Sequence, residues 1–396
     1  MRLLSTELSH MSSSGNAITT SFIKGKETEK QMKKVLCVVS NLRTNNGVAS
    51  CMMNYFPFTN GDKFQIDFLC LDDTESEYVA YLKEHGFSYY VLPNGSDRKD
   101  STNKKYIMNI IETGNYDIVH VNIVYYWALY ILKCAKKCEV KHRILHAHNP
   151  RLTNNLSNKR RTLLFTELCN FYATDYVACT ESAGKSVFGK RHFTVIHNAV
   201  EAQKYSFDKK ARDKYRTQYD LESKFVLGTS CRHIEQKNPF FLIDVFEDLH
   251  KIKPETVLLW VGLGPLKEQL EHYVEEKGLS NAVLFLGARS DMNLLYSAMD
   301  AFVLPSLFEG LGMVYIEAQF NGLYCFASDH VYKDTNVTGN ITYLPIDKGT
   351  EPWVKAILEC QYPRHDLLYA SEIKNSGYDI LSEKDSLKSF YESCLR

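Results

Sequence analysis

Two carboxylates in the second half of the chain are spaced so that they could bind a ligand rich in hydroxyl groups. Glu309 follows the apolar run Ala301–Leu304, and Glu317 comes eight residues later, in a stretch of helical character. Gly310 and Gly312 lie between them and leave the backbone free where that helix begins. Because a carboxylate accepts several hydrogen bonds at once, the pair could bind a sugar or a ribose. The alternative, a capping glutamate and a surface glutamate, is weakened because Glu317 lies within an apolar stretch.

A second group of polar residues is basic. Arg232 and Lys237 follow the apolar run Phe225–Thr229. The next two residues, Asn238 and Pro239, are residue types that favour the N-cap and the first position of a helix. We therefore expect both cations in a strand-to-helix loop beside the positive end of a helix, which suits a diphosphate. An ordinary solvated pair of charges is the alternative.

The first half of the chain offers candidates that are less specific. Gly47 stands in a polar loop after the run Val35–Val39, where backbone amides could approach a phosphate or a sugar, although a plain turn would look the same. His146 and His148 close another apolar run, and side chains two residues apart on a strand point the same way. The two histidines could begin a metal site, but no third ligand accompanies them, so we expect no metal.

The hydrophobic pattern indicates which elements position these residues. Short, almost continuously apolar runs alternate with longer segments of helical period. Such runs are typical of parallel strands that are covered on both faces. We therefore expect an α/β fold of two doubly wound domains, with ligands bound beyond the carboxyl ends of the strands. The predicted strands are Val35–Val39, Phe64–Leu71, Tyr89–Leu92, Ile118–Val121, Arg143–His146, Tyr176–Cys179, Phe225–Thr229, Val257–Val261, Val283–Leu286, Ala301–Leu304 and Leu323–Ala327.

The chain divides into four predicted parts. The first is polar and lacks the apolar centre of a signal peptide, so it is a disordered extension or precedes a natural start at Met32. The two domains separate near the charged segment Glu201–Asp220, which contains no strand-like run. The last part includes an amphipathic helix, Ser382–Leu395, that we expect to pack back on the N-terminal domain. The parts are residues 1–31, 32–203, 204–375 and 376–396.

Composition excludes several other classes of protein. Basic and acidic residues balance at 47 each, which gives no sign of nucleic-acid binding. The 11 cysteines form no CxxC pair, as expected in the reducing cytoplasm, and no apolar run approaches the length of a membrane span. One stretch, Lys133–Arg161, is locally basic, with nine Lys or Arg against a single acid.

Taken together, the motifs resemble GT-B retaining glycosyltransferases of family 4, which have two Rossmann-like domains facing across a cleft. Glu309 and Glu317 match the E-x7-E motif of that family, and Arg232 and Lys237 resemble its diphosphate-binding pair. Other segments are similar to the family's I-x-N-G-V, V-G-x-G-P and F-L-G motifs and to its capsule, exopolysaccharide and O-antigen subgroup. These segments are Ile196–Val200, Val261–Pro265, Phe285–Arg289, Ile144–Asn149 and Ser306–Leu311.

The resemblance implies retaining transfer of a sugar from a nucleotide sugar to a lipid-linked glycan acceptor in cell-surface polysaccharide synthesis. It favours UDP as the nucleotide of the donor, with GDP as the alternative. It assigns acceptor binding to residues 32–203 and donor binding to residues 204–375, with no metal. A family histidine that contacts the donor sugar corresponds to His148, with His146 as the alternative. The implied catalytic residues are Glu309, His148, Arg232 and Lys237, and the implied donor-binding residues also include Gly47, Ala288, Gly310, Leu311, Gly312 and Glu317.

Other functions fit the pattern less well. A Rossmann dehydrogenase needs a third fingerprint glycine, and Lys267 stands there instead. A sugar-nucleotide 2-epimerase and a non-catalytic sugar-binding relative share the expected architecture and remain alternatives. The lipid-linked acceptor implies peripheral contact with the inner face of the membrane, which the basic stretch Lys133–Arg161 could provide. The aromatic residues Tyr125, Tyr126, Trp127 and Phe165 could dip into the membrane interface, or several of them could belong to the core. The alternative for the basic stretch is an ordinary solvated face.

Overall fold

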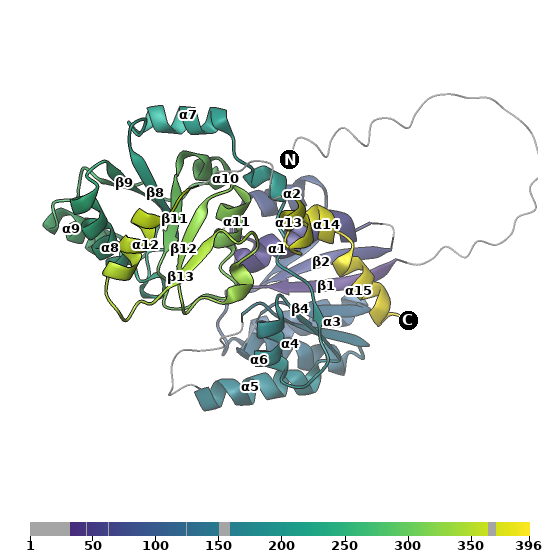
Figure 1. Cartoon of the computed structure of the whole chain (residues 1–396). Coiled ribbons are helices and arrows are strands. Elements are labelled where there is room, and N and C mark those ends of the chain that lie inside the picture. The colour runs from purple at the N-terminus through teal and green to yellow at the C-terminus, as the bar shows by residue number, and fades with distance from the viewer. Residues whose placement is uncertain (1–31, 45, 62, 124, 150–158, 363–369) are drawn as a thin grey trace, which may run out of the picture. The chain divides into compact units, whose positions relative to one another are not determined.

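The computed structural model describes residues 32–396 except 45, 62, 124, 150–158 and 363–369 (Figure 1). The predicted extension, residues 1–31, lies outside the described part. Two parallel β-sheets organise the chain, so the predicted α/β class with two doubly wound sheets is confirmed. All 11 cysteines are free, as expected.

The first sheet has seven strands in the order β3-β2-β1-β4-β5-β6-β7, and every neighbouring pair is parallel. Its strands are β1 (Lys33–Val39), β2 (Phe64–Cys70), β3 (Tyr89–Val91), β4 (Ile118–Val121), β5 (His142–Ala147), β6 (Asp175–Ala178) and β7 (Thr194–Val195). Helices α1 (Gly47–Thr59), α2 (Glu77–Glu84), α3 (Ser101–Gly114), α4 (Tyr125–Lys137), α5 (Lys159–Tyr172) and α6 (Glu181–Phe188) connect them.

The second sheet has six parallel strands in the order β10-β9-β8-β11-β12-β13. Its strands are β8 (Phe225–Ser230), β9 (Thr256–Val261), β10 (Val283–Phe285), β11 (Ala301–Leu304), β12 (Tyr324–Ser328) and β13 (Ile341–Leu344). Its helices are α7 (Lys209–Gln218), α8 (Pro239–Ile252), α9 (Lys267–Glu276), α10 (Met292–Leu295), α11 (Met313–Phe320) and α12 (Glu351–Glu359). The chain ends with α13 (Ala370–Asn375), α14 (Ile380–Glu383) and α15 (Ser386–Cys394), and the short 3-10 helices are η2 (Ala202–Tyr205), η3 (Glu235–Lys237), η4 (Tyr296–Ala298) and η5 (Lys333–Thr335).

The apolar runs form strands because helices cover both faces of each sheet. In β1, Leu36 and Val38 belong to one core, and Val35, Cys37 and Val39 belong to the core on the opposite face. Burial on both faces explains why the runs are continuous rather than alternating. All 11 predicted strands are present, but β7 and β13 were missed because these edge strands are short or only half apolar.

One predicted helix start needs a correction. Pro239 is the first residue of α8, as expected. Asn238 precedes it, but its backbone is left-handed, with φ 52°, and its side chain makes no capping hydrogen bond. The reason is local: η3 ends one residue earlier, and the chain must turn sharply from it into α8. Asparagine tolerates that conformation better than most residues, so it serves the turn rather than the cap.

The chain passes between the sheets twice, and the two passages are bonded to each other. Val200, after β7, forms a parallel bridge with Asp379, before α14. The Val200 amide donates to the carbonyl of Tyr378, and the amide of Ile380 donates to the carbonyl of Val200. Helix α15, yellow in Figure 1, then packs against α1 of the first sheet. Its residues Leu387 and Tyr391 are buried in the core beneath that helix.

Candidate active site

Lys237 and Glu309 form an ion pair at the carboxyl ends of two adjacent strands of the second sheet. Lys237 ends η3, which follows β8, and Glu309 lies between β11 and α11. Lys237 Nζ is 2.5 Å from Glu309 Oε1, and the hydroxyl of Ser306 donates to the same oxygen over 2.5 Å. The Glu309 side chain is only 6% exposed. The two groups assigned separately to phosphate and sugar therefore contact each other directly.

Glu317 lies on α11, as predicted, and two tyrosines hold its carboxylate. The Tyr296 hydroxyl donates to Glu317 Oε2 over 2.9 Å, and Tyr205 forms a second side-chain hydrogen bond with the same group. Burial raises the pKa of Glu317, and the two tyrosine donors oppose that rise. Both carboxylates of the spaced pair are thus oriented by neighbours before any ligand arrives.

Three other residues that were predicted to bind the sugar donor are exposed, unlike Lys237 and Glu309. Arg232 is exposed, and its guanidinium has no hydrogen-bond or ion-pair partner among the described residues. Ala288, after β10, and Gly47, at the start of α1, are also exposed. Open space surrounds Gly47, where an added Cβ would meet nothing within 4 Å. These positions leave a cation and two small residues accessible to a ligand.

After Glu309, the loop between β11 and α11 brings backbone rather than side chains to the site. Gly312 caps α11 with φ 74°, and an added Cβ there would lie 2.9 Å from the Tyr315 ring, so this turn requires glycine. The Leu311 side chain is buried, which leaves only its backbone available. A Cβ on Gly310 would lie 3.4 Å from the carbonyl oxygen of His148, so the loop after β5 closely approaches this one.

His148 stands directly after β5 and stacks on His146, with ring centroids 3.9 Å apart. Its Nδ1 lies 3.0 Å from Asn198 Oδ1, and its Nε2 lies 3.0 Å from Asn122 Oδ1. A neutral imidazole donates through one nitrogen only, so one amide must turn its NH2 group toward the ring when His148 is neutral. The predicted alignment of the two histidines is therefore observed, and His148 is the one nearer the loop of Gly310.

A buried polar chain continues from these histidines to the C-terminal helix. His146 Nδ1 lies 3.1 Å from His120 Nε2, and His120 Nδ1 lies 2.7 Å from the hydroxyl of Tyr391. His146 Nε2 is buried without a hydrogen-bond partner among the described residues. Burial lowers the pKa of His120 to about 3 and of His148 to about 4, and it also lowers the pKa of His146. All three rings are therefore neutral at physiological pH.

This set of groups can bind a polar, anionic ligand and stabilise charge that develops on it. Arg232 supplies an accessible cation. Lys237 and Glu309 form a largely buried ion pair, so water screens their charges only weakly. Among the described residues, no cluster of potential metal ligands occurs at these loops. In the described part of the chain, one group of potential metal ligands occurs, and it lies where β5 and β6 begin, whereas the site loops follow the ends of their strands.

Comparison with known proteins identifies the class of enzyme. Residues 211–340, which contain Arg232, Lys237, Glu309 and Glu317, match the family model described as "Glycosyl transferases group 1". EpsF of Bacillus subtilis is 26% identical over 372 residues, covering 91% of this chain and 96% of EpsF. The chain is a GT-B glycosyltransferase.

The UDP-Gal:α-D-GlcNAc-diphosphoundecaprenol α-1,3-galactosyltransferase of Escherichia coli is 23% identical to this glycosyltransferase over 365 residues, covering 87% of the chain and 93% of that enzyme. The crystal structure of HepE from Anabaena, in complex with UDP and glucose, aligns with a TM-score of 0.74 and 18% identity. The alignment covers 91% of this chain and all of HepE, so the two proteins share the fold.

Several residues of the glycosyltransferase site escaped the sequence analysis. Ser306, Tyr205 and Tyr296 hold the carboxylates, and Asn122 and Asn198 hold His148. Asn198 carried a signal, because it lies in the I-x-N-G-V-like segment. The tyrosines had none, since 25 tyrosines occur in the chain and nothing local distinguishes these two.

Proposed function

We propose that this glycosyltransferase moves a sugar from a UDP-sugar to a lipid-linked glycan acceptor, with retention of configuration, in the synthesis of a cell-surface polysaccharide. The observation that carries the proposal is the ion pair of Lys237 and Glu309, together with the accessible guanidinium of Arg232 in the same β8-to-α8 segment as Lys237. A diphosphate needs cations and a sugar needs hydrogen-bond acceptors, and these loops present both together.

Each part of the nucleotide sugar has a proposed partner in the site. Arg232 and Lys237 bind the diphosphate, Glu309 binds the sugar hydroxyls, and Glu317 binds the ribose hydroxyls. The backbone amides of residues 310–312 add donors at the start of α11. Ala288 faces the base, as the resemblance to the F-L-G motif suggests, and Gly47 leaves room for the phosphates from the first sheet.

The proposed reaction needs no protein nucleophile. The bond from the anomeric carbon to the diphosphate breaks, the acceptor hydroxyl oxygen bonds to that carbon on the same face, and the departing diphosphate takes the hydroxyl proton. The protein then chiefly stabilises the negative charge that grows on the diphosphate, which is the task of Arg232 and Lys237. Neutral His148 meets the sugar from the first sheet and does not act as an acid. To hydrogen-bond a sugar hydroxyl, one ring nitrogen exchanges its asparagine partner for that hydroxyl.

Two names among the relatives support the choice of donor and acceptor. The E. coli enzyme is named for a UDP-linked galactose donor and a diphosphoundecaprenol-linked acceptor, and the HepE structure is described with UDP and glucose. A lipid-linked acceptor remains at the membrane, so the enzyme must come to that surface.

The decisive experiment measures nucleoside diphosphate release from a panel of UDP- and GDP-sugars, with and without an undecaprenyl-diphosphate-linked sugar, in buffer containing EDTA. We expect release from a UDP-sugar that depends on the acceptor, an α-linked product from an α-linked donor by NMR, and no stimulation by Mg²⁺ or Mn²⁺. Transfer restricted to GDP-sugars, an inverted product, or activity lost in EDTA and restored by Mg²⁺ would each overturn the corresponding part of the proposal.

The surface that meets the membrane is proposed to be the face formed by α4 and α5. Lys133, Lys136, Lys137 and Lys141 are exposed there. Of the aromatic candidates, Trp127 is buried and donates to the carbonyl of Ser96, and Tyr126 and Phe165 pack against the core, which was the alternative for these residues. The exposed apolar side chains are instead Leu163, Leu164 and Phe171.

The basic stretch is also less uniform than its sequence suggests. The guanidinium of Arg143 donates to the backbone carbonyls of Val140 and Tyr172, so it does not face outward with the lysines. The side chains of Tyr125, Arg151, Lys159, Arg160 and Arg161 lie outside the described residues. Among the described helices, none is long and apolar enough to cross a bilayer.

A further inference from the structure

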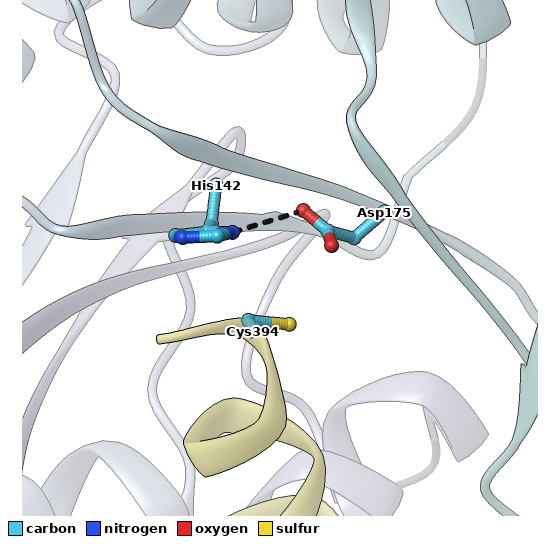
Figure 2. Close-up of side chains that lie close together, drawn as sticks. All are labelled: His142, Asp175 and Cys394. Atoms are coloured by element: carbon cyan, nitrogen blue, oxygen red, sulfur yellow. Dashed lines mark hydrogen bonds and ion pairs between the residues drawn. The ribbon is translucent and has the colours of Figure 1, made fainter. Parts of the chain in front are cut away.

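Three side chains of different chemistry converge where β5 and β6 begin (Figure 2). His142 is the first residue of β5, Asp175 is the first residue of β6, and Cys394 is the last residue of α15. One nitrogen, one carboxylate oxygen and the sulfur all lie within 4.8 Å of one another. His142 Nδ1 is 3.3 Å from Asp175 Oδ2, and the Cys394 thiol lies on the same side of both groups.

These groups are the three side-chain types that bind zinc in proteins. Imidazole nitrogen, carboxylate oxygen and thiolate sulfur bind Zn²⁺ at about 2.0–2.3 Å in a tetrahedral arrangement. The three ligand atoms here lie within 4.8 Å of one another, which is slightly wider than a tetrahedral zinc site allows. Small side-chain rotations would bring them to zinc-binding distance. All three residues are partly exposed, which leaves a water molecule access to the fourth position.

Neighbouring groups favour a cation at this place. The Thr174 hydroxyl donates to Asp175 Oδ2 over 2.6 Å and so fixes the orientation of the carboxylate. The cluster lies at the C-terminal end of α15, where the helix dipole favours positive charge. Arg143 interacts electrostatically with Asp175, but its guanidinium is committed to the backbone carbonyls of Val140 and Tyr172.

We propose that His142, Asp175 and Cys394 form a zinc site that fastens α15 to the first sheet. The site is separate from the transfer chemistry, because it lies where the strands begin and the transfer site lies where they end. Its effect is structural: α15 also carries Tyr391, whose hydroxyl bonds to His120 in the buried chain that leads to His148. The spacing of the ligands in the sequence gave no metal signature, since the first two are 33 residues apart and the third lies in another part of the chain.

The test uses the full chain, purified without metal and then titrated with Zn²⁺ or Co²⁺. We expect one equivalent of Zn²⁺ to bind, thermal stability to rise with zinc concentration, and Co²⁺ to give a thiolate-to-cobalt charge-transfer absorption. Cys394→Ser should abolish the absorption and the zinc-dependent stabilisation, and His142→Gln should weaken zinc binding at least tenfold.

Matched controls distinguish metal binding at this site from nonspecific metal binding by other thiols. Cys138 and Cys360 are the other partly exposed cysteines, so Cys138→Ser and Cys360→Ser should leave both signals unchanged. The proposal is overturned if metal-free protein binds no stoichiometric zinc, or if Cys394→Ser binds zinc as tightly as the parent. It is equally overturned if the cobalt absorption disappears with Cys138 or Cys360 instead.

Discussion

At the scale of single residues, Lys237 and Glu309 depend on each other, because both are largely buried and each is the other's ionic partner. Lys237→Ala should reduce transfer by about 3 kcal/mol of transition-state stabilisation, roughly a hundredfold, and Arg232→Ala should do the same. Lys237→Ala should also lower the free energy of unfolding by about 3–5 kcal/mol, because it leaves a buried carboxylate uncompensated. The exposed Arg232 has no such structural role, so Arg232→Ala should unfold like the parent. Steady-state kinetics and urea denaturation check both effects, and near-normal turnover in both variants would refute the phosphate-binding assignment.

The two glutamates should differ in kinetics. Glu309→Gln keeps the size of the side chain but removes the charge beside Lys237, so we expect it chiefly to lower kcat. Glu317→Gln should chiefly raise the donor KM, because ribose binding contributes equally before and during the reaction. Tyr296→Phe, which removes one donor to Glu317, should change KM in the same direction but less. The reverse pattern for the two glutamates would show that their roles are exchanged.

At the scale of elements, buried His120 on β4 and His146 on β5, together with half-buried His148 directly after β5, have lowered pKa values. Each is neutral in the folded protein and takes up a proton near pH 6.5 when the chain unfolds. Their stability contribution is therefore complete above about pH 6.5 and is lost as the pH falls toward the folded pKa values. Near pH 5 the loss should reach about 2 kcal/mol for His120 and for His148, measured by urea denaturation against a reference near pH 7. His120→Gln should flatten this dependence, and stability that is constant or rises on acidification would contradict the prediction.

The hydroxyl of Tyr391 on α15 should stabilise the first sheet through its contact with His120. Tyr391→Phe leaves His120 Nδ1 buried without its partner at 2.7 Å, so we expect a loss of about 1–3 kcal/mol in the free energy of unfolding. Phe390→Tyr, one residue earlier on the same helix, is the control: Phe390 is only partly buried, so it should tolerate the added hydroxyl at little cost. Thermal and urea denaturation of the two variants give the comparison. Equal losses would mean that the His120 contact has no special weight.

The elements also show how far the sequence could predict this molecule. Continuous apolar runs indicated the strands well, because burial on both faces leaves a strong pattern, whereas the edge strands β7 and β13 left a weak one. The site loops were predicted for the same reason, since they follow those runs. The partners were not: the contact of Lys237 with Glu309 joins residues 72 apart, and that of His120 with Tyr391 joins residues 271 apart. Such pairs depend on strand order, which the apolar runs do not specify.

At the scale of the whole molecule, the basic and apolar face of α4 and α5 should bind anionic membranes. Replacing two lysines removes about 2 kcal/mol of attraction, at about 1 kcal/mol each, so Lys133→Glu with Lys137→Glu should weaken binding to anionic vesicles at least tenfold. Lys210→Glu with Lys214→Glu on α7 is the matched control, because these lysines have the same spacing and exposure. Sedimentation with anionic and neutral vesicles, at low and high salt, measures the effect. Equal binding to both vesicle types, or equal loss in both double variants, would remove this face as the docking surface.

The two bonded passages between the sheets have a consequence for how the protein is made. Because Val200 and Asp379 are neighbours, the second sheet is in effect an insertion into the first half of the molecule. On the ribosome, His120 emerges 271 residues before Tyr391, which at ordinary rates of synthesis is roughly 15 to 50 seconds. Throughout that interval the first sheet lacks α15 and the hydroxyl that its buried histidines require. The half of the protein that is synthesised first is therefore the half that is completed last.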